Sequence, residues 1–372
     1  MATTPQSPQR IARLVPLTDV LAWIDANVRT VAPREAGIAD ALGRTLAQEI
    51  RIAHAMPVQA ISLRDGFALQ SDWTSDASSY APAPLPQAPL RVGAGDALPP
   101  GADCVAALDD VAIRGERAEA LAVVAPGDGI LPAGGDAAAD QSLLNAGRRL
   151  RASDVALLCA AKISRVSIRA PCIRVVRAGG ADDIIASAAQ MMAAAIVAEG
   201  GTISGEDGAL ASALQDNDAD AVIAIGGTGA GRNDASVTAL AGAGQVAFHG
   251  IGLRPGETAA IGVANAKPVL VVPGRIDAAL ACWLMLGQRV FARLAGRDVN
   301  DVAAPVTLTR KITSTIGIAD VVLLKRSGSE VEPLASGYWP VRALAQADSY
   351  CVVAPESEGF PAGAIVSAST LP

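Results

Sequence analysis

The strongest constraint on the fold comes from an apolar run that ends in a cluster of glycines. Ala221 to Ile225 is uninterrupted by polar residues, and Gly226-Gly227-Thr228-Gly229-Ala230-Gly231 follows it directly. A short apolar run without alternation is typical of a strand buried on both faces, and the glycines indicate a tight loop at its end. Such a strand needs helices on both sides, so the pattern predicts a three-layer α/β sheet.

The segments around this strand alternate between helical and strand patterns, as a largely parallel sheet requires. Helices are expected at 183–199, which ends at Gly200-Gly201, at 209–214, and from about 277 to 294. Further strands are expected at 173–176, 245–248, 260–263 and 269–272. Because ligands bind beyond the carboxyl ends of the strands in such sheets, the loop after Ile225 is a candidate binding loop.

The flanking regions have different patterns. Apolar residues recur at helical spacing over 17–48 and are interrupted at Pro33, which predicts two short helices. Over 51–140, short Val, Ile and Leu runs are broken by glycine and proline, which indicates a β-rich region. A helix with Ser153 as its N-cap is expected up to Ala161, followed by a strand at 166–168. Short strands return at 321–325, 331–334, 351–354 and 365–368.

These patterns predict a multi-domain α+β protein with four parts. We expect a helical part (1–50 with 141–170), an inserted β-rich domain (51–140), the α/β domain (171–300) and a small C-terminal β domain (301–372). A chain of 372 residues with 51% hydrophobic residues has enough apolar material for several cores.

Composition excludes some classes of partner and site. The net charge of -7 argues against nucleic acid or an anionic membrane as the main partner. The cysteines show no C-x-x-C pair, which excludes the usual zinc and redox-pair sites, and we expect buried, reduced thiols at Cys104, Cys159, Cys172, Cys282 and Cys351. We find no export signal and no membrane span, and therefore expect a cytoplasmic protein. His54 and His249 are too far apart in sequence to indicate a site, and we assign them no role.

Four motifs follow one another along the chain. They are Ser62-Leu63-Arg64-Asp65-Gly66-Phe67-Ala68, Pro99-Pro100-Gly101-Ala102-Asp103, the glycine loop continued to Asp234, and Arg254-Pro255-Gly256. Their order and separation resemble the molybdopterin molybdenumtransferase family, the bacterial MoeA type that also forms the E domain of gephyrin. Arg310-Lys311-Ile312 and 358–363 extend the resemblance to nearly the whole chain.

The resemblance implies a fold, an assembly and a reaction. It implies an α/β domain of the molybdopterin-binding (MoCF) type, a linker or dimerisation role for the helical part, and a barrel-like C-terminal domain. It also implies an elongated homodimer, with each active site between the α/β domain of one subunit and the β-rich and C-terminal parts of the other. The family inserts molybdate into adenylylated molybdopterin and releases AMP, with help from Mg²⁺.

Ser62 and Asp65 match the family pattern of a serine, two variable residues, and Asp-Gly-aromatic-Ala. Asp65-Gly66 taken alone is a common turn dipeptide. In the context of the other motifs, the resemblance implies that Asp65 is an active-site carboxylate that holds a divalent metal against phosphate oxygens.

The glycine loop coincides with the family pattern Gly-Gly-x-Ser-x-Gly-x-x-Asp at Gly226, Gly227, Gly231 and Asp234, with Gly229 where serine is usual. The glycines would offer unobstructed N–H groups to an anion. Asp234 precedes a helical pattern, so it is interpreted as a helix N-cap, as a ligand-facing or metal-holding carboxylate, or as both.

Two further acids are candidates for the catalytic set. Asp136 stands in Gly134-Gly135-Asp136, where the family has Gly-Glu-Asp, and it is alternatively a simple loop residue. Asp207 lies where the family has an acidic pair after the second strand of the α/β domain. Its alternative is a favourable interaction with the dipole of the helix that begins near Ala209.

Basic residues are candidates for binding phosphate or molybdate. Arg254 stands at the first basic position of the family's Lys-Pro-Gly-Lys, whereas Glu257 reverses the sign of the second. Pro273 and Gly274 match the family's Leu-Pro-Gly-Asn-Pro, and Arg275 after them could supply the positive charge lost at Glu257. A solvated surface arginine is the alternative for both.

Other departures leave the activity open. Ala94-Gly95-Asp96 replaces the family's Thr-Gly-Ala, and Ala178-Gly179-Gly180-Ala181-Asp182 replaces its Thr-Gly-Asp-Glu-Leu, so a hydroxyl and two acids are missing. Asp182 or Asp183 could reach the same space. The sequence therefore leaves two functions: the molybdenumtransferase, or a non-catalytic molybdopterin-binding or delivery protein that serves one client molybdoenzyme.

Overall fold

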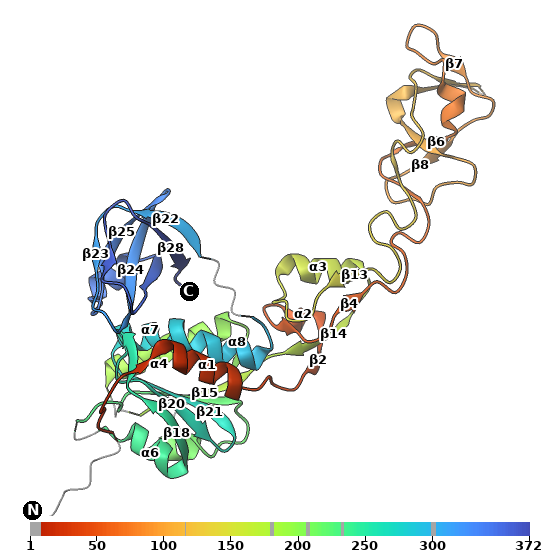
Figure 1. Cartoon of the computed structure of the whole chain (residues 1–372). Coiled ribbons are helices and arrows are strands. Elements are labelled where there is room, and N and C mark those ends of the chain that lie inside the picture. The colour runs from red at the N-terminus through yellow and green to blue at the C-terminus, as the bar shows by residue number, and fades with distance from the viewer. Residues whose placement is uncertain (1–8, 116, 179–181, 206–208, 232–233, 299–302) are drawn as a thin grey trace, which may run out of the picture. The chain divides into compact units, whose positions relative to one another are not determined.

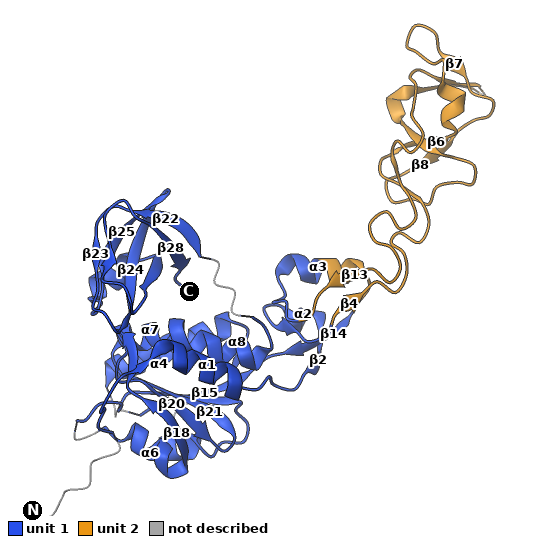
Figure 2. Cartoon of the chain, viewed as in Figure 1, with its two compact units in different colours: residues 1–48, 147–156, 164–372 blue, residues 49–146, 157–163 orange. Residues whose placement is uncertain are grey.

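The computed structural model describes residues 9–115, 117–178, 182–205, 209–231, 234–298 and 303–372 (Figure 1). The chain forms two compact units (Figure 2). Unit 1 comprises residues 1–48, 147–156 and 164–372, and unit 2 comprises 49–146 and 157–163. The division into four parts remains a prediction.

A six-stranded sheet in unit 1 has the strand order β16-β15-β17-β21-β20-β18. Its strands are β15 (Cys172–Arg177), β16 (Thr202–Ile203), β17 (Ala221–Ile225), β18 (Gly244–His249), β20 (Ala260–Ala264) and β21 (Lys267–Val272). The first four strands in the spatial order are parallel, and β20 and β18 are antiparallel to their neighbours. The expected strands of a largely parallel sheet are confirmed.

Alternate residues of the central strand β17 enter two different cores. Ile223 and Ile225 pack with α1 (Leu17–Asn27), α4 (Asp183–Ala198) and the helix after β21. Val222 and Ala224 pack on the opposite face with residues of α5 (Leu210–Ala213) and α6 (Ser236–Ala243). Figure 1 shows α6 on one side of the sheet and α1, α4, α7 and α8 on the other. The predicted three-layer arrangement is confirmed.

The closing helix consists of α7 (Ile276–Cys282), a π-helical turn (Trp283–Gly287) and α8 (Gln288–Ala295). A Cβ atom added at Gly287 would lie 2.3 Å from the Trp283 ring, so only glycine lets the indole lie against the backbone at this turn. The helix ends at Gly296, whose φ of 66° is the left-handed cap that favours glycine.

The helix from Ile276 to Ala295 is long and apolar enough to span a membrane by length and composition. Of its apolar window, 78% is buried inside the protein. Packing against the sheet therefore accounts for its apolar surface.

The C-terminal strands of unit 1 close into a ring. They are β22 (Ala304–Leu308), β24 (Ala319–Ser327), β25 (Glu330–Ala335), β26 (Ser349–Val353) and β28 (Ile365–Thr370). Pairings run from β24 through β25, β22, β28 and β26 back to β24, which confirms the barrel-like domain. A parallel ladder joins β19 (Ile251–Arg254) to β24, with Arg254 opposite Asp320. On its other side, β19 pairs with β1 (Val15–Pro16).

The shorter elements that remain lie outside these two sheets. Those before the α/β domain are β2 (Arg34–Gly37), α2 (Ile38–Ala41), β3 (Thr45–Leu46), α3 (Ala152–Ala160) and β14 (Arg165–Arg169). Those near the C-terminus are β23 (Ile312–Thr313), β27 (Gly359–Phe360) and α9 (Val341–Gln346). The expected N-cap at Ser153 is wrong, because α3 already begins at Ala152.

Unit 2 is built from short strands, as expected for this stretch. They are β4 (Ile50–Arg51), β5 (Ile61–Ser62), β6 (Gly66–Leu69), β7 (Ala83–Pro84), β8 (Leu90–Val92), β9 (Cys104–Ala107), β10 (Val111–Arg114), β11 (Arg117–Ala120), β12 (Ile130–Leu131) and β13 (Ser142–Leu144). Two single turns, Ser71–Thr74 and Leu108–Asp110, complete it. The sheet β8-β6-β9 carries its core, with Phe67 and Leu69 in one cluster and Ala68 in another.

Candidate functional site

The glycine loop leaves the carboxyl end of β17, as the sequence predicts. Gly226 and Gly227 have φ values of 96° and 69°, which side-chain-bearing residues rarely adopt. A Cβ atom at Gly227 would also lie 2.4 Å from the Ser236 hydroxyl. Gly274, in the loop after β21, approaches so closely that its Cβ would lie 3.4 Å from the Cα of Gly226. Backbone geometry therefore requires glycine at 226 and 227, and Gly274 packs against the loop.

Every carbonyl at the start of this loop is occupied by a donor from the protein. Ser236 donates from its hydroxyl to Gly226 O at 2.7 Å and from its N–H to Gly227 O at 3.1 Å. The side chain of Gln9 donates to Gly227 O at 2.9 Å and to Gly229 O at 2.7 Å. His249 Nε2 lies 3.0 Å from Thr228 O and donates to it, because a carbonyl oxygen only accepts.

The N–H groups of the same peptides have no partner in the part of the chain that the structure describes. Within it, no atom accepts a hydrogen bond from the N–H of Gly227, Thr228, Gly229 or Ala230. Gly227 and Thr228 are buried, and a buried N–H without a partner costs free energy. Consecutive N–H groups at the end of a buried strand are suited to binding an anion.

Asp234 folds back over the loop. Its carboxylate accepts the N–H of Gly231 at 2.8 Å, and a Cβ atom at Gly229 would lie 2.8 Å from Asp234 Oδ2. A serine at 229, as in the family, would therefore require the Asp234 carboxylate to move. The expectation that Asp234 is a helix N-cap is wrong: the N-cap of α6 is Ala235, without a side-chain bond, because the Asp234 carboxylate is bonded to the preceding turn.

The acids near the first strand of the sheet have other partners. The Asp182 carboxylate accepts the N–H of Ile184 at 2.8 Å and caps α4, and Asp183 is exposed in the first turn of that helix. Asp207, a predicted catalytic residue, lies outside the described residues.

Arg254 is held by a buried carboxylate of the C-terminal barrel. Its Nη2 donates to Asp320 Oδ2 at 2.7 Å, and Asp320 has no exposed surface. Asp320 also accepts from the Ser314 hydroxyl and the Gly337 N–H. The hydrogen bond and charge of Asp320 raise the pKa of Arg254 against the effect of burial. The alternative of a solvated surface arginine is therefore wrong for Arg254, because the guanidinium is tied to the barrel.

Arg275 is paired in a similar way at the next loop. Its guanidinium makes two hydrogen bonds to Asp277, which is 4% exposed, and lies 4.7 Å from the ring centre of Tyr338. Asp277 also accepts the N–H of Trp339 at 3.2 Å. The hydrogen bond from Asp277 is the largest cause of a raised pKa at Arg275. Of its two sequence neighbours, Pro273 is buried and Gly274 packs against the glycine loop.

Glu257 lies close enough to both arginines for its charge to raise the pKa of each. Its carboxylate accepts the N–H of Gly256 at 3.1 Å. The region therefore contains the guanidiniums of Arg254 and Arg275 and the carboxylates of Asp320, Asp277 and Glu257. Negative charge exceeds positive charge in this group.

In unit 2, Asp65 and Asp96 lie on either side of Gly93. The Asp65 carboxylate accepts the N–H of Ala94 at 2.9 Å, and that of Asp96 accepts the N–H of Gly93 at 2.7 Å. A Cβ atom at Gly93 would lie 3.5 Å from Asp65 Oδ1 and 3.3 Å from Asp96 Oδ2. The acid gained at 96 is thus a neighbour of Asp65, and both residues are exposed.

Ser62, the first residue of the matched motif and a predicted substrate-binding residue, is held within this turn. It is 1% exposed, its hydroxyl donates to Arg64 O at 2.5 Å, and its N–H donates to Asp96 O at 2.9 Å. Asp136 is exposed, and its N–H donates to Met56 O at 2.9 Å. In the described part of the chain, the Asp136 carboxylate makes no hydrogen bond or ion pair with Asp65.

Two comparisons with sequence families cover most of the chain. Residues 15–161 match the model of the MoeA N-terminal region, domains I and II, and residues 181–293 match the model of a probable molybdopterin binding domain. The chain belongs to the MoeA family. The resemblance carried by the motifs is thereby confirmed.

Individual relatives of this MoeA-family chain are distant. A putative molybdopterin biosynthesis protein of Methanocaldococcus jannaschii is 28% identical over 159 residues, which is 42% of this chain and 37% of that protein. A molybdopterin biosynthesis MoeA protein of Pyrococcus horikoshii has a TM-score of 0.79 at 20% identity, over 96% of this chain and all of that chain. A molybdenum cofactor biosynthesis protein of Pyrococcus furiosus has a TM-score of 0.60 at 18% identity over 96% of this chain and 100% of its own. At these identities the two structures show the fold.

The family's implied metal is Mg²⁺, which binds through one or two carboxylates together with water and substrate phosphates. The exposed, adjacent carboxylates of Asp65 and Asp96 fit such a donor set. Asp234, the second predicted metal ligand, already accepts one hydrogen bond. The described residues contain no group of three or more His, Cys, Asp or Glu side chains placed to bind a metal by themselves.

Sequence reasoning missed Gln9, His249, Asp277 and Asp320. Gln9 could not be predicted, because it lies 218 residues before the glycine whose carbonyl it binds. His249 could not be predicted either, because its partner is a backbone carbonyl 21 residues away. Asp277 had a local signal, because a carboxylate two residues after an arginine is positioned to pair with it. Asp320 precedes an apolar strand pattern, which gives no indication of a buried ion pair.

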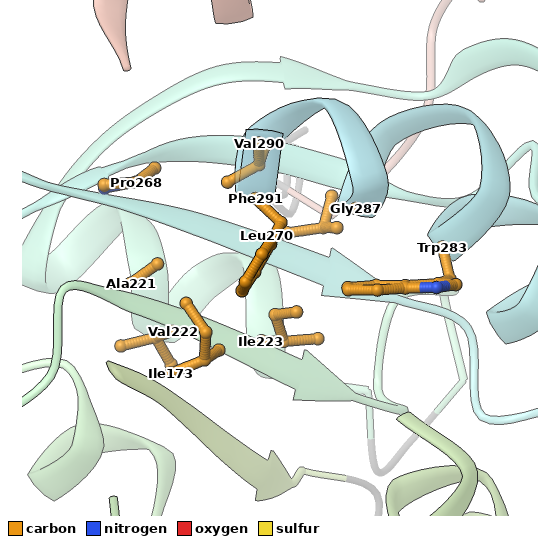
Figure 3. A pocket seen from close by; sticks show the side chains of 10 residues that line it. All are labelled: Ile173, Ala221, Val222, Ile223, Pro268, Leu270, Trp283, Gly287, Val290 and Phe291. Carbon is orange, nitrogen blue, oxygen red and sulfur yellow. The ribbon is translucent and has the colours of Figure 1, made fainter. Parts of the chain in front are cut away.

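A small cavity lies between the strands of the sheet and the helix that follows β21 (Figure 3). Its volume of about 10 Å³ accommodates at most one water molecule. Its lining includes Ile173, Ala221 and Pro268 from the first two residues of their strands, together with Trp283 and Phe291. Ligands of such sheets bind at the carboxyl ends, so this cavity is a packing void.

Proposed function

We propose that this protein acts on molybdopterin and inserts molybdate into its adenylylated form, with release of AMP. The observation that carries the proposal is the glycine loop, in which four successive N–H groups are without partners in the described chain while their carbonyls are held. These donors fit the phosphate groups of such a substrate. Membership of the MoeA family supports the same pathway, molybdenum cofactor biosynthesis.

In the proposed reaction Asp65 would hold Mg²⁺, with Asp96 as a second carboxylate. A bound metal would offset negative charge that develops on the phosphoanhydride as AMP leaves. The Ala94 N–H fixes one carboxylate oxygen of Asp65, so the carboxylate has a defined orientation. Asp136, Asp207 and Asp234 are proposed as the remaining catalytic acids, and Arg254 and Arg275 as groups that limit charge repulsion at the substrate.

A second candidate is a non-catalytic molybdopterin-binding or delivery protein for a client molybdoenzyme. The ion pairs favour it, because Arg254 and Arg275 are already neutralised by Asp320 and Asp277. Glu257 adds a further negative charge beside them, which opposes the binding of an oxyanion such as molybdate.

One experiment separates the two candidates. Purified protein is incubated with adenylylated molybdopterin, molybdate and Mg²⁺, and AMP release is followed against a control without molybdate. Molybdate-dependent turnover supports the transferase. Tight binding of molybdopterin without AMP release supports the delivery protein, and absence of both contradicts a role on this substrate. A cytoplasmic location and a homodimeric assembly complete the proposal.

A further inference from the structure

The amide of Gln9 is buried against the glycine loop and uses all its polar groups there. The side chain is 2% exposed. Its Nε2 donates to Gly227 O at 2.9 Å and to Gly229 O at 2.7 Å, and its Oε1 accepts from the Thr238 hydroxyl at 3.1 Å. Both N–H donors of one amide therefore hold two carbonyls that are two residues apart.

Holding a carbonyl also orients the N–H group of the next residue. A trans peptide is planar, and its C=O and N–H point in opposite directions. Bonds from Gln9 to Gly227 O and Gly229 O therefore direct the N–H groups of Thr228 and Ala230 away from Gln9. The bond from His249 to Thr228 O acts in the same way on the N–H of Gly229.

The two N–H groups that Gln9 orients belong to the set without described partners. Ser236 holds the Gly226–Gly227 and Gly227–Thr228 peptides through their carbonyls, so the first turn of the loop, including the Thr228 N–H, has support besides Gln9. The Gly229–Ala230 peptide has no such second support: Gln9 supplies the hydrogen bond that its carbonyl accepts among the residues described. Loss of Gln9 would therefore leave the Ala230 N–H without a fixed orientation, whereas the first turn of the loop would keep its bonds to Ser236.

We propose that Gln9 is a positioning residue that directs the N–H groups of Thr228 and Ala230 at a phosphate group of the ligand. This inference rests on the proposed molybdopterin-binding function and assigns a role to a residue outside the glycine loop. Each oriented N–H makes a charge-assisted hydrogen bond only when the ligand carries the phosphate. The contribution of Gln9 is therefore coupled to the phosphate and not to the pterin ring.

The test combines a change in the protein with a change in the ligand. Gln9→Met keeps the side-chain volume and removes both donors. Titration calorimetry compares wild type and variant with molybdopterin and with its dephosphorylated form. We expect about 10-fold to 100-fold weaker binding of molybdopterin by the variant and equal binding of the dephosphorylated form. This loss corresponds to about one charge-assisted hydrogen bond, that of Ala230 N–H, because Ser236 still holds the peptide of Thr228.

Two further variants keep the inference falsifiable. Thr238→Val removes only the bond to Gln9 Oε1 and should cause a smaller loss with the same dependence on the phosphate; it replaces Gln9→Met if that variant does not fold. Thr258→Val removes the hydroxyl that contacts the Thr228 side chain at 2.8 Å and touches no loop carbonyl, so it should bind as wild type.

The outcomes separate this inference from the function on which it rests. Equal losses for both ligands, or no loss for either, would show that Gln9 has no specific relation to the phosphate and would overturn the inference alone. If wild-type protein binds neither ligand, the proposed function fails together with it.

Discussion

The guanidinium of Arg254 donates to the carboxylate of Asp320 at 2.7 Å, and this carboxylate is fully buried. The pair joins β19 to β24 at the position where the two strands are in register. Arg254, which the sequence predicts as a substrate-binding residue, is therefore also part of the junction between β19 and the barrel.

Arg254→Met should destabilise unit 1, because it leaves the Asp320 carboxylate buried without its cation. We expect a loss of about 3 kcal/mol or more in the free energy of unfolding, measured by urea denaturation. Arg310→Met is the matched control: its pair with Glu332 is exposed, with side chains 62% and 47% accessible, and should cost less than about 1 kcal/mol. Similar small losses in the two variants would show that the buried pair is not a structural tie.

Asp65→Asn should abolish most of the proposed reaction without unfolding unit 2. Asparagine keeps an oxygen that can accept the Ala94 N–H but lacks the charge that holds Mg²⁺. AMP release should fall by about 100-fold, equivalent to roughly 3 kcal/mol of transition-state stabilisation, while the melting temperature stays unchanged. Asp72→Asn changes another exposed aspartate of this unit and should be silent. Full activity in folded Asp65→Asn protein would refute the metal-holding role.

Asp154 should contribute stability that depends on pH. Burial opposes ionisation of this carboxylate, but hydrogen bonds from Arg148 and Arg151 outweigh it and lower its pKa from 3.8 to about 2. Since the folded pKa lies below the unfolded value, the stabilisation is present above pH 3.8 and is lost as pH falls through about 2. Asp154→Asn should cost roughly 2 kcal/mol at neutral pH and progressively less in acid, measured by denaturation over this range. A difference that does not vary with pH would contradict the ionic origin.

Thiol reactivity should single out Cys159. It is exposed, which corrects the expectation that all five cysteines are buried, and Cys172 is half-buried. Burial raises the pKa of Cys104 and of Cys351 to about 12, and it also raises that of Cys282, so these thiols should resist an aromatic disulfide reagent in native protein. Cys159→Ser should remove the fast phase of labelling. A fast phase that persists in this variant would show that another thiol is accessible.

The protein should be a homodimer in solution, as the family resemblance implies. Light scattering at micromolar concentration would give twice the mass of the 37.5 kDa chain. A monomer that binds molybdopterin normally would contradict a dimer-dependent site.

Much of the fold could be predicted because local patterns report burial directly. The apolar run at Ala221–Ile225 predicted a strand with the observed bounds, since a strand covered on both faces excludes polar residues throughout. Helix α4 was predicted from its alanine-rich sequence and from the glycines at its end. The error at Ser153 concerned the start of α3, which begins at Ala152. Helix ends are hard to predict because several neighbouring residues can begin a helix equally well.

The candidate site was less predictable because its side chains act through distant partners. Asp234 resembles a helix cap in sequence, but its carboxylate accepts the N–H of Gly231 in the preceding turn and makes no bond to the helix. Arg254 resembles a free cation, and its partner is 66 residues further along the chain. No local pattern could show either choice.

The sequence by itself determined the layers, the glycine loop and the family, because these depend on periodicity, on residues without a side chain and on the order of motifs. The tertiary structure decided which charges are paired and which loop N–H groups have no partner among the described residues. Asp320 pairs with Arg254, and Gln9 bonds two loop carbonyls, because folding brings together groups that are far apart in the sequence. Hydrogen bonds and ion pairs act over only a few ångströms, so their partners are fixed by distances in space.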